Sequence, residues 1–165
     1  MQHQLHNISP VYDSNSKILI LGSFPSVKSR ESQFFYGHPQ NRFWKLLAAL
    51  LESEVPQTVE EKRAFLLRSR IALWDVIASC DIEGSSDSSI KNVKPNDIKG
   101  VLKKADIHGI YCNGNKSHQL YQKYIQPTTG RKAFCLPSTS PANAAYQMDR
   151  LLEKWGVITD ALDHA

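Results

Sequence analysis

The chain has 165 residues, of which 41% are hydrophobic and 22% are charged, and its formal net charge is +4. This length is enough for one domain with its own core, and the composition is typical of a soluble globular protein. The sequence also excludes an integral membrane protein, because no apolar run approaches the roughly 20 residues that a membrane-spanning helix needs. The mildly basic charge favours a polyanionic partner only slightly.

The amino terminus lacks the basic and then apolar pattern of a signal peptide, so we expect a cytoplasmic protein. Three cysteines, Cys80, Cys112 and Cys135, end or interrupt apolar runs and show no Cys-x-x-Cys spacing. We expect them to be buried free thiols, because an iron–sulfur cluster normally uses four thiolates.

Short apolar runs alternate with helical patterns along the chain. The apolar runs predict strands at 17–21, 71–77, 107–112 and 133–136. The helical patterns predict helices at 41–51, 59–70, 95–105, 117–125 and 144–155. This alternation indicates an α/β fold, a three-layer α/β/α sandwich around a central four-stranded parallel sheet, with residues 1–165 as a single domain.

Several residues predict where helices begin. Pro95 is expected in the first turn of one helix, and Ser140, followed by Pro141, is expected to be the N-cap of the last long one. Between 81 and 94 the chain turns polar, with Gly-Ser-Ser-Asp-Ser-Ser at 84–89. We interpret this segment as a mobile loop and not as a domain linker.

Two motif segments follow predicted strands. Gly-Ser-Phe-Pro-Ser at 22–26 runs on to Phe-Tyr-Gly-His-Pro-Gln-Asn-Arg-Phe-Trp at 35–44, and Leu-Pro-Ser-Thr-Ser-Pro-Ala-Asn stands at 136–143. Open parallel sheets bind ligands at the carboxyl ends of their strands, so we expect both segments to line one crevice. Their aromatic rings and amides suit gripping a flat ring and positioning a water better than acid–base catalysis.

Each motif residue also has a purely structural interpretation. Gly22 allows a ligand to approach the backbone and the amides beyond it can bind phosphate, but such a turn is structural equally often. Phe43 and Trp44 fit core positions at a helix start. Asn41 fits the N-cap of that helix, and it can still present its amide to a ligand. Tyr36 is held beside the crevice by a constrained loop that contains a glycine and a proline.

Two polar residues follow other strands. Asp75 is either a solvated strand end or an acceptor aimed into the crevice, and Asn113 lies in an Asn-Gly pair that is also a good turn. His38 has no second ligand at a suitable spacing, so no zinc site is expected. A Ser138, His38 and Asp75 triad is disfavoured, because the chain has no Gly-x-Ser-x-Gly nucleophile elbow.

With these segments placed, the chain resembles the uracil-DNA glycosylase superfamily, and within it most closely the hypoxanthine-DNA (deoxyinosine) glycosylase branch, over about residues 17–155. Gly-Ser-Phe-Pro-Ser is similar to the first family motif and Leu-Pro-Ser-Thr-Ser-Pro to the second. The His-Pro-x-Asn-Arg-Phe-Trp string also occurs in the mismatch-specific uracil enzymes. In order and at this spacing the strings are a strong signal.

Two departures from the family pattern bear on the substrate. Phe24 stands where relatives carry a water-orienting Asp or Asn, and Leu136 stands where uracil enzymes carry a histidine. Both departures argue against uracil excision.

The resemblance implies specific roles. Asn41 would be catalytic, its carbonyl orienting a water, and Tyr36 would stack on the extruded base. Asp75 would accept the N1–H of hypoxanthine, whereas the bare N1 of adenine would be repelled. The implied base-binding residues are Phe24, Tyr36, Asp75 and Asn113. The implied DNA-binding residues are Gly22, Ser23, Pro25, Ser26, Lys28, Arg42, Ser138, Thr139 and Ser140, with Arg30 as a further candidate phosphate contact.

The resemblance further implies a monofunctional DNA glycosylase that removes deaminated bases, chiefly hypoxanthine, without a cofactor, a metal or a lysine nucleophile. The expected partner is double- or single-stranded DNA containing deaminated bases, with no membrane contact, and the chain is expected to be a monomer. The loop at 138–141 would fill the space left by the extruded base. Two alternatives stay open, a mismatch-directed uracil or xanthine glycosylase and a non-catalytic module that binds damaged DNA.

Overall fold

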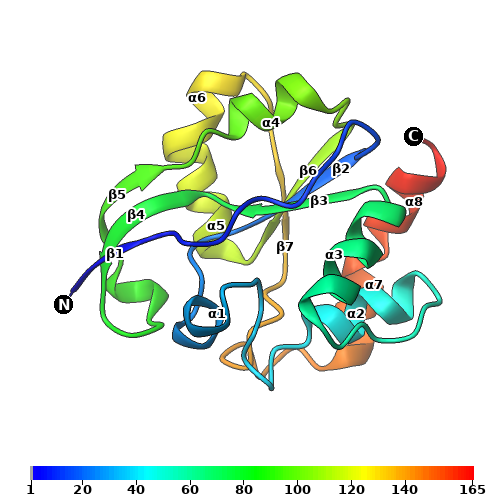
Figure 1. Cartoon of the computed structure of the whole chain (residues 1–165), viewed down its shortest axis with the longest axis horizontal. Helices are drawn as coiled ribbons and strands as arrows, with labels where there is room; N and C mark the ends of the chain where they lie inside the picture. The colour runs from blue at the N-terminus through cyan, green and yellow to red at the C-terminus, as the bar shows by residue number, and fades with distance from the viewer. Residues whose placement is uncertain (1) are drawn as a thin grey trace.

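A parallel sheet of four strands forms the centre of the computed structural model, which describes residues 2–165 (Figure 1). Its strands are β2 (Ile18–Gly22), β3 (Ile71–Asp75), β6 (Gly109–Asn113) and β7 (Phe134–Leu136). They lie in the order β3-β2-β6-β7, and every pairing is parallel. The predicted central sheet is therefore confirmed, with strand ends shifted by one or two residues in most cases.

Helices cover both faces of this sheet (Figure 1). One face carries α2 (Phe43–Leu50), α3 (Val59–Arg68), α7 (Met148–Trp155) and α8 (Val157–Asp163). The other carries α4 (Ile98–Lys104), α5 (Asn115–Leu120), a π-helical turn η2 (Tyr121–Ile125) and α6 (Gln126–Thr129). Strand β2 is apolar throughout because its residues feed two cores, with Ile18 and Ile20 on one side and Leu19 and Leu21 on the other. The three-layer α/β/α arrangement is confirmed.

A second, antiparallel sheet was not predicted. It contains β1 (Gln2–Leu5), β4 (Ile77–Ile82) and β5 (Lys91–Pro95), in the order β1-β4-β5. The strand predicted at 71–77 is confirmed only as far as Asp75, where β3 ends, because the chain continues from Ile77 as β4 of the antiparallel sheet. The predicted loop at 81–94 is wrong, since it contains the end of β4, a short 3₁₀ turn η1 (Asp87–Ser89) and β5.

Helix boundaries differ from the prediction where caps were misassigned. Helix α4 begins at Ile98 because the Asp97 side chain accepts from the Gly100 N–H, and Pro95 ends a strand instead of opening a helix. Helix α7 begins at Met148 with Gln147 as its N-cap, so Ser140 is not a cap and residues 140–147 form a loop. Helices α1 (Val27–Ser32) and α8 were not predicted. Helix α3 is confirmed, with a Thr58 capping box at its start.

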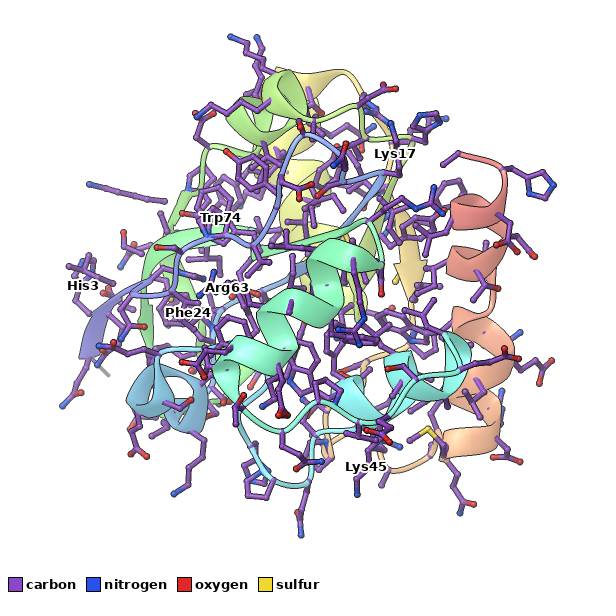
Figure 2. The ribbon with its side chains drawn as sticks, turned by 45° about the vertical axis from the view of Figure 1, so that its right-hand side comes forward. His3, Lys17, Phe24, Lys45, Arg63 and Trp74 are labelled. Atoms are coloured by element: carbon purple, nitrogen blue, oxygen red, sulfur yellow. The ribbon has the colours of Figure 1, made fainter. Side chains whose placement is uncertain are left out.

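The strands place the motif segments together. Lys17, directly before β2, and Lys45, in α2, lie at opposite ends of the molecule (Figure 2). The carboxyl ends of the parallel strands point toward the end where α1 and the loops that follow β2 and β7 lie (Figure 1). Within the described residues 2–165, no helix is both long and apolar enough to cross a bilayer.

Candidate active site

A cavity of about 370 Å³ opens at the carboxyl ends of β2, β3 and β6. This volume falls within the roughly 300–1,000 Å³ of small-molecule sites. Most of the predicted site residues line it, namely Gly22, Ser23, Phe24, Pro25, Ser26, Tyr36, Asn41, Asp75, Asn113, Ser138, Thr139 and Ser140. Lys28 and Arg42 lie outside its lining.

Asn41 reaches the cavity from the turn that leads into α2. Its Oδ1 accepts two hydrogen bonds, from the Phe43 N–H at 3.0 Å and from the Thr139 hydroxyl at 2.8 Å. A backbone N–H can only donate, so the contact with Phe43 fixes which end of the amide is the carbonyl. The Nδ2 amino group is then the end left for a ligand, in contrast to the prediction that the carbonyl orients a water.

Thr139 connects Asn41 to strand β6. Asn113 donates from Nδ2 to the Thr139 Oγ1 at 3.0 Å, and its Oδ1 accepts from the Thr139 N–H at 3.0 Å. Thr139 is fully buried. The two motif segments and the end of β6 therefore form one hydrogen-bonded network, in which Asn113 positions Thr139 and Thr139 positions Asn41.

Asp75 ends β3 inside the protein. Its Oδ2 lies 2.8 Å from the His6 Nε2, and both side chains are at most 5% exposed. Its Oδ1 lies so close to Gly22 that a Cβ built at that position would stand 2.3 Å from it. Gly22 is thus needed so that the carboxylate can lie against the backbone of β2, and the solvated alternative for Asp75 is wrong.

Tyr36 combines an unusual backbone with an isolated hydroxyl. Its φ of 52° is left-handed, and its ring stacks on Phe43 with a centroid distance of 4.2 Å. The hydroxyl is buried without a hydrogen-bond partner. Burial, together with the negative charge of Asp75, raises the pKa of Tyr36 far above its usual value. The phenol therefore stays protonated and is available to donate to a ligand in the cavity.

Phe24 lines the cavity, and its ring contacts the imidazole of His6 and the guanidinium of Arg30. Its ring meets the edge of His6 at 6.0 Å between centroids, and the Arg30 guanidinium lies 5.4 Å from it. Arg30 also donates to the Gly84 carbonyl at 3.0 Å. These contacts engage one side of the Arg30 guanidinium, while its Nη1 is buried without a hydrogen-bond partner. The phosphate contact of Arg30 stays a prediction.

Two further basic residues were predicted to contact DNA. Arg42 donates to the carbonyls of Thr139, Ser140, Asn143 and Tyr146, so its guanidinium holds the 139–146 loop. Lys28 is exposed on α1 and has only a 3.8 Å ion pair with Glu31. Lys28 is therefore free to reach a phosphate, whereas Arg42 acts through the loop that it holds.

Sequence reasoning missed His6 and Asp87. Asp87 lines the cavity from the turn between β4 and β5 and accepts from the Ser23 hydroxyl at 3.1 Å, and burial raises its pKa. Neither residue lies in a recognisable motif. His6 directly follows β1 and Asp87 begins the η1 turn between β4 and β5, so both are placed by the antiparallel sheet that the pattern did not reveal. Leu136, at the position of the missing histidine, is buried.

The three cysteines differ in their exposure to solvent. Cys80 and Cys112 are buried as predicted, but Cys135 is exposed because it lies on the edge strand β7. In the part of the chain that the structure describes, no three His, Cys, Asp or Glu side chains are grouped to hold a metal ion.

Comparison with known proteins identifies the family. The sequence model of the Uracil DNA glycosylase superfamily matches residues 9–161. The chain is 37% identical to a hypoxanthine DNA glycosylase of Methanosarcina acetivorans over 142 residues, which cover 85% of this chain and 89% of that protein. It is 35% identical to a hypoxanthine DNA glycosylase of Methanosarcina barkeri over 136 residues, 81% of this chain and 85% of the relative.

A solved structure agrees with both matches. The solution NMR structure of a protein from Methanosarcina acetivorans, described as a candidate uracil DNA glycosylase, superposes with a TM-score of 0.83 at 33% identity. The superposition covers 99% of this chain and 100% of that one. Fold, motif order and sequence similarity all lead to one conclusion: the chain belongs to the uracil DNA glycosylase superfamily.

Proposed function

We propose that this chain is a monofunctional DNA glycosylase that hydrolyses the N-glycosidic bond of deoxyinosine and releases hypoxanthine. The curated relatives with this name support the proposal, since the chain spans most of their length. The observation that carries it is the placement of Asp75, whose Oδ2 is bound by His6 while its Oδ1 lies against Gly22 at the cavity.

The recognition step follows from the hydrogen-bonding edge of the base. Enzymes that act on a base extrude it from the helix and read its edge inside a pocket. Hypoxanthine offers an N1–H, which the Asp75 carboxylate accepts. Adenine presents a bare N1, so its lone pair would face a buried negative charge without a proton between them. This unpaired contact excludes the normal base from a site that accepts its deaminated product.

The chemical step needs charge stabilisation more than a strong base. As the C1′–N9 bond breaks, its electron pair moves into the purine and positive charge develops on the sugar. A water oxygen then bonds to C1′ and gives up one proton to solvent, while the purine anion takes up a proton, so that an abasic deoxyribose and neutral hypoxanthine are formed. We assign the Asn41 Nδ2 as the donor that stabilises the negative charge on the departing purine. No covalent enzyme intermediate is needed, so the DNA strand stays intact.

The remaining predicted contacts are with the phosphates of the DNA backbone and with the space in the duplex that the extruded base leaves. We assign Lys28 to a phosphate and the 138–141 loop to the space left by the extruded nucleotide. Arg42 would keep that loop in place through its four carbonyl contacts.

The proposal is tested with purified protein and duplexes that carry a single inosine, uracil, xanthine or adenine at one position. Alkali cleaves the strand wherever a base has been released, and untreated samples report any strand cutting by the protein itself. We expect cleavage of the inosine strand only after alkali. An Asn41→Ala variant that still binds the duplex is the control for a contaminating glycosylase.

The same experiment separates the alternatives. Uracil and xanthine also carry an imino N–H beside a carbonyl, so the Asp75 acceptor can pair with them too. Release of uracil without release of hypoxanthine would refute the proposed substrate. Tight binding of the inosine duplex without release of any base would identify a module that recognises the damaged base but does not hydrolyse its glycosidic bond.

A further inference from the structure

We propose that His6 is a positioning residue that sets the base preference of the site by keeping Asp75 a hydrogen-bond acceptor. This inference rests on the proposed function, because it assigns to Asp75 the role of reading the extruded base. No motif contains His6, which follows strand β1 at the amino-terminal end of the chain.

The tautomer of His6 follows from its two hydrogen bonds. The Ile8 N–H donates to Nδ1 at 3.2 Å, so Nδ1 carries a lone pair in the neutral ring. The proton of the neutral imidazole then lies on Nε2, which is 2.8 Å from the Asp75 Oδ2. His6 is therefore the donor of this pair and Asp75 is the acceptor.

The surroundings hold the imidazole in this orientation. Its ring lies in an aromatic cage, with centroids 6.0 Å from Phe24, 6.2 Å from Phe35 and 6.4 Å from Trp74. The His6 N–H donates to the Ala78 carbonyl at 2.8 Å, which joins it to β4. The side chain is only 3% exposed, so water does not compete for its contact with Asp75.

The other titratable groups near the pair make this donor necessary. Tyr36 and Asp87 both interact electrostatically with Asp75, and ionising either of them would add negative charge next to the carboxylate. Cys112 interacts with Tyr36 and would add negative charge beside that ring if it ionised. Arg30 is turned toward Phe24 and Gly84. The imidazole thus supplies the hydrogen bond that offsets the burial of the carboxylate.

The consequence is a base preference that depends on His6. Without the Nε2–H, one oxygen of the buried carboxylate has no donor, so the group is no longer held as an acceptor alone. A protonated Asp75 is a donor as well as an acceptor, so it no longer discriminates against the bare N1 of adenine. The inosine reaction should slow at the same time, because N1–H of hypoxanthine needs the carboxylate form.

The test compares His6→Phe, which keeps an aromatic ring in the cage, with His6→Gln, whose amide nitrogen can still donate to Asp75. Single-turnover rates on inosine and adenine duplexes are measured from about pH 5.5 to about pH 8.5. We expect His6→Phe to lower the ratio of the inosine rate to the adenine rate by about tenfold, which corresponds to the loss of one hydrogen bond to a charged group. We expect His6→Gln to keep the native ratio.

The chain offers a matched control on β1, three residues before His6. His3 lies 3.0 Å from Asp81, but this pair is solvent-accessible and neither residue lines the cavity. His3→Phe should leave both rates and their pH dependence unchanged. In an Asp75→Asn background, His6→Phe should have no further effect on the ratio, because the group through which it acts has been replaced.

A second measurement does not depend on activity. Nitrogen-15 NMR of the His6 ring reports whether the neutral imidazole carries its proton on Nε2, and we expect that tautomer. If the native protein releases no hypoxanthine, the proposed function fails while the NMR result still tests the pair. An Nδ1–H tautomer, or a His6→Phe rate ratio that equals the native one, would overturn the role of His6. Equal changes in His6→Phe and His6→Gln would do so as well, because they would point to packing instead of hydrogen bonding.

Discussion

In the side-chain amide of Asn41, the oxygen accepts two hydrogen bonds from the protein, whereas the amino group is left to bind a ligand. Arg42, and not Asn41 as predicted, is the N-cap of α2. The Asn41 carbonyl lies one residue earlier and accepts from the Phe43 N–H and from the Thr139 hydroxyl, so the orientation of the whole group is set by the protein. A donor held in this way costs no reorganisation when charge develops on a bound base. The amide therefore acts as a preorganised donor at the cavity.

We predict that Asn41→Asp changes the thermal stability little but strongly lowers the rate of base release. The carboxylate keeps the oxygen that accepts from Phe43 and Thr139, and a negative charge at a helix start is favourable, so thermal stability should change little. The lost donor should lower the single-turnover rate on inosine DNA by about 10²-fold or more. Asn41→Ala should show the same loss of rate and also lose about 1 kcal/mol of unfolding free energy, because Phe43 and Thr139 lose the oxygen that accepts their hydrogen bonds.

The Asp variant also decides which end of the amide matters. If the carbonyl of Asn41 oriented a water, the carboxylate of Asn41→Asp would perform that task at least as well. Retained activity in this variant, measured beside inactive Asn41→Ala, would therefore contradict the assignment of Nδ2.

At this scale the sequence predicted the residues of the parallel crevice and missed their partners. Asn41 and Asp75 lie in or directly after apolar patterns, so their place at strand or helix ends follows from periodicity. His6 carries no such mark, because its role depends on a contact with a residue 69 positions away. The polarity of the Asn41 amide was not predictable either, since two hydrogen bonds from distant and local groups fix it.

The loop between β7 and α7 is held in place by side-chain hydrogen bonds to its backbone carbonyls. Residues 140–147 have no regular structure of their own, yet Arg42 donates to four of the carbonyls between 139 and 146. Asn143 adds a contact from Nδ2 to the Ser138 carbonyl at 3.0 Å. One guanidinium thus replaces the backbone pairing that a helix would have supplied.

We predict that Arg42→Lys loosens this loop although the charge is kept. A single ammonium cannot donate along the several directions that the planar guanidinium covers. Amide hydrogen exchange measured by mass spectrometry should become faster in peptides that span 139–147 and stay unchanged in β2. The glycosylase rate should fall by about tenfold or more, since small misplacements in an active site are costly.

Arg63→Lys is the matched control on another helix. Arg63 lies on α3 with its guanidinium over the Phe34 ring, and it holds no loop. Exchange in 139–147 that responds equally to both variants would show that Arg42 has no special part in ordering the loop.

Elements with an apolar period were predictable, and those without one were not. Strands β2 and β6 are continuous apolar runs, whereas β1 reads Gln-His-Gln-Leu and β5 reads Lys-Asn-Val-Lys-Pro. Charged and polar residues are typical of edge strands, which need no apolar pattern because one side faces water. Pro141 misled the prediction of α7, because a Ser-Pro pair is as common in loops as at helix starts.

The distribution of basic residues over the whole molecule can be tested by the salt dependence of DNA binding. Lys28 lies on α1 at the cavity end, and Lys103 lies on α4 at the opposite end (Figure 1). Each phosphate contact contributes about 0.9 to the slope of log K against log salt for duplex DNA. Lys28→Ala should reduce that slope by about one, and Lys103→Ala should leave it unchanged. Equal slopes for both variants would place the DNA elsewhere on the surface.

The buried thiols make the stability of the whole fold depend on pH. Burial raises the pKa of Cys80 to about 11 and that of Cys112 to about 12. In the unfolded chain a thiol ionises near about 8.5, so between that pH and the folded value the unfolded state loses protons that the folded state keeps. The unfolding free energy should therefore fall as pH rises above about 8.5, and chemical denaturation at a series of pH values measures it.

A thiol reagent gives the complementary result. At neutral pH the native protein should react at Cys135 alone, and the unfolded protein at all three positions, because Cys80 and Cys112 have no access to solvent. Cys112→Ala should weaken the pH dependence of unfolding without changing the number of thiols that react in the native state.

Strand β1 pairs with β4 across a separation of 80 residues at Gln2 and Ile82, and the loop held by Arg42 lies further along the chain still. During synthesis His6 leaves the ribosome before Asp75, and the 139–146 loop emerges later still. Contacts so distant in sequence slow folding, because long loops must close before they form. We therefore expect nascent chains to lack the hydrogen bond between Thr139 and Asn41, and with it glycosylase activity, until the 139–146 loop has been translated.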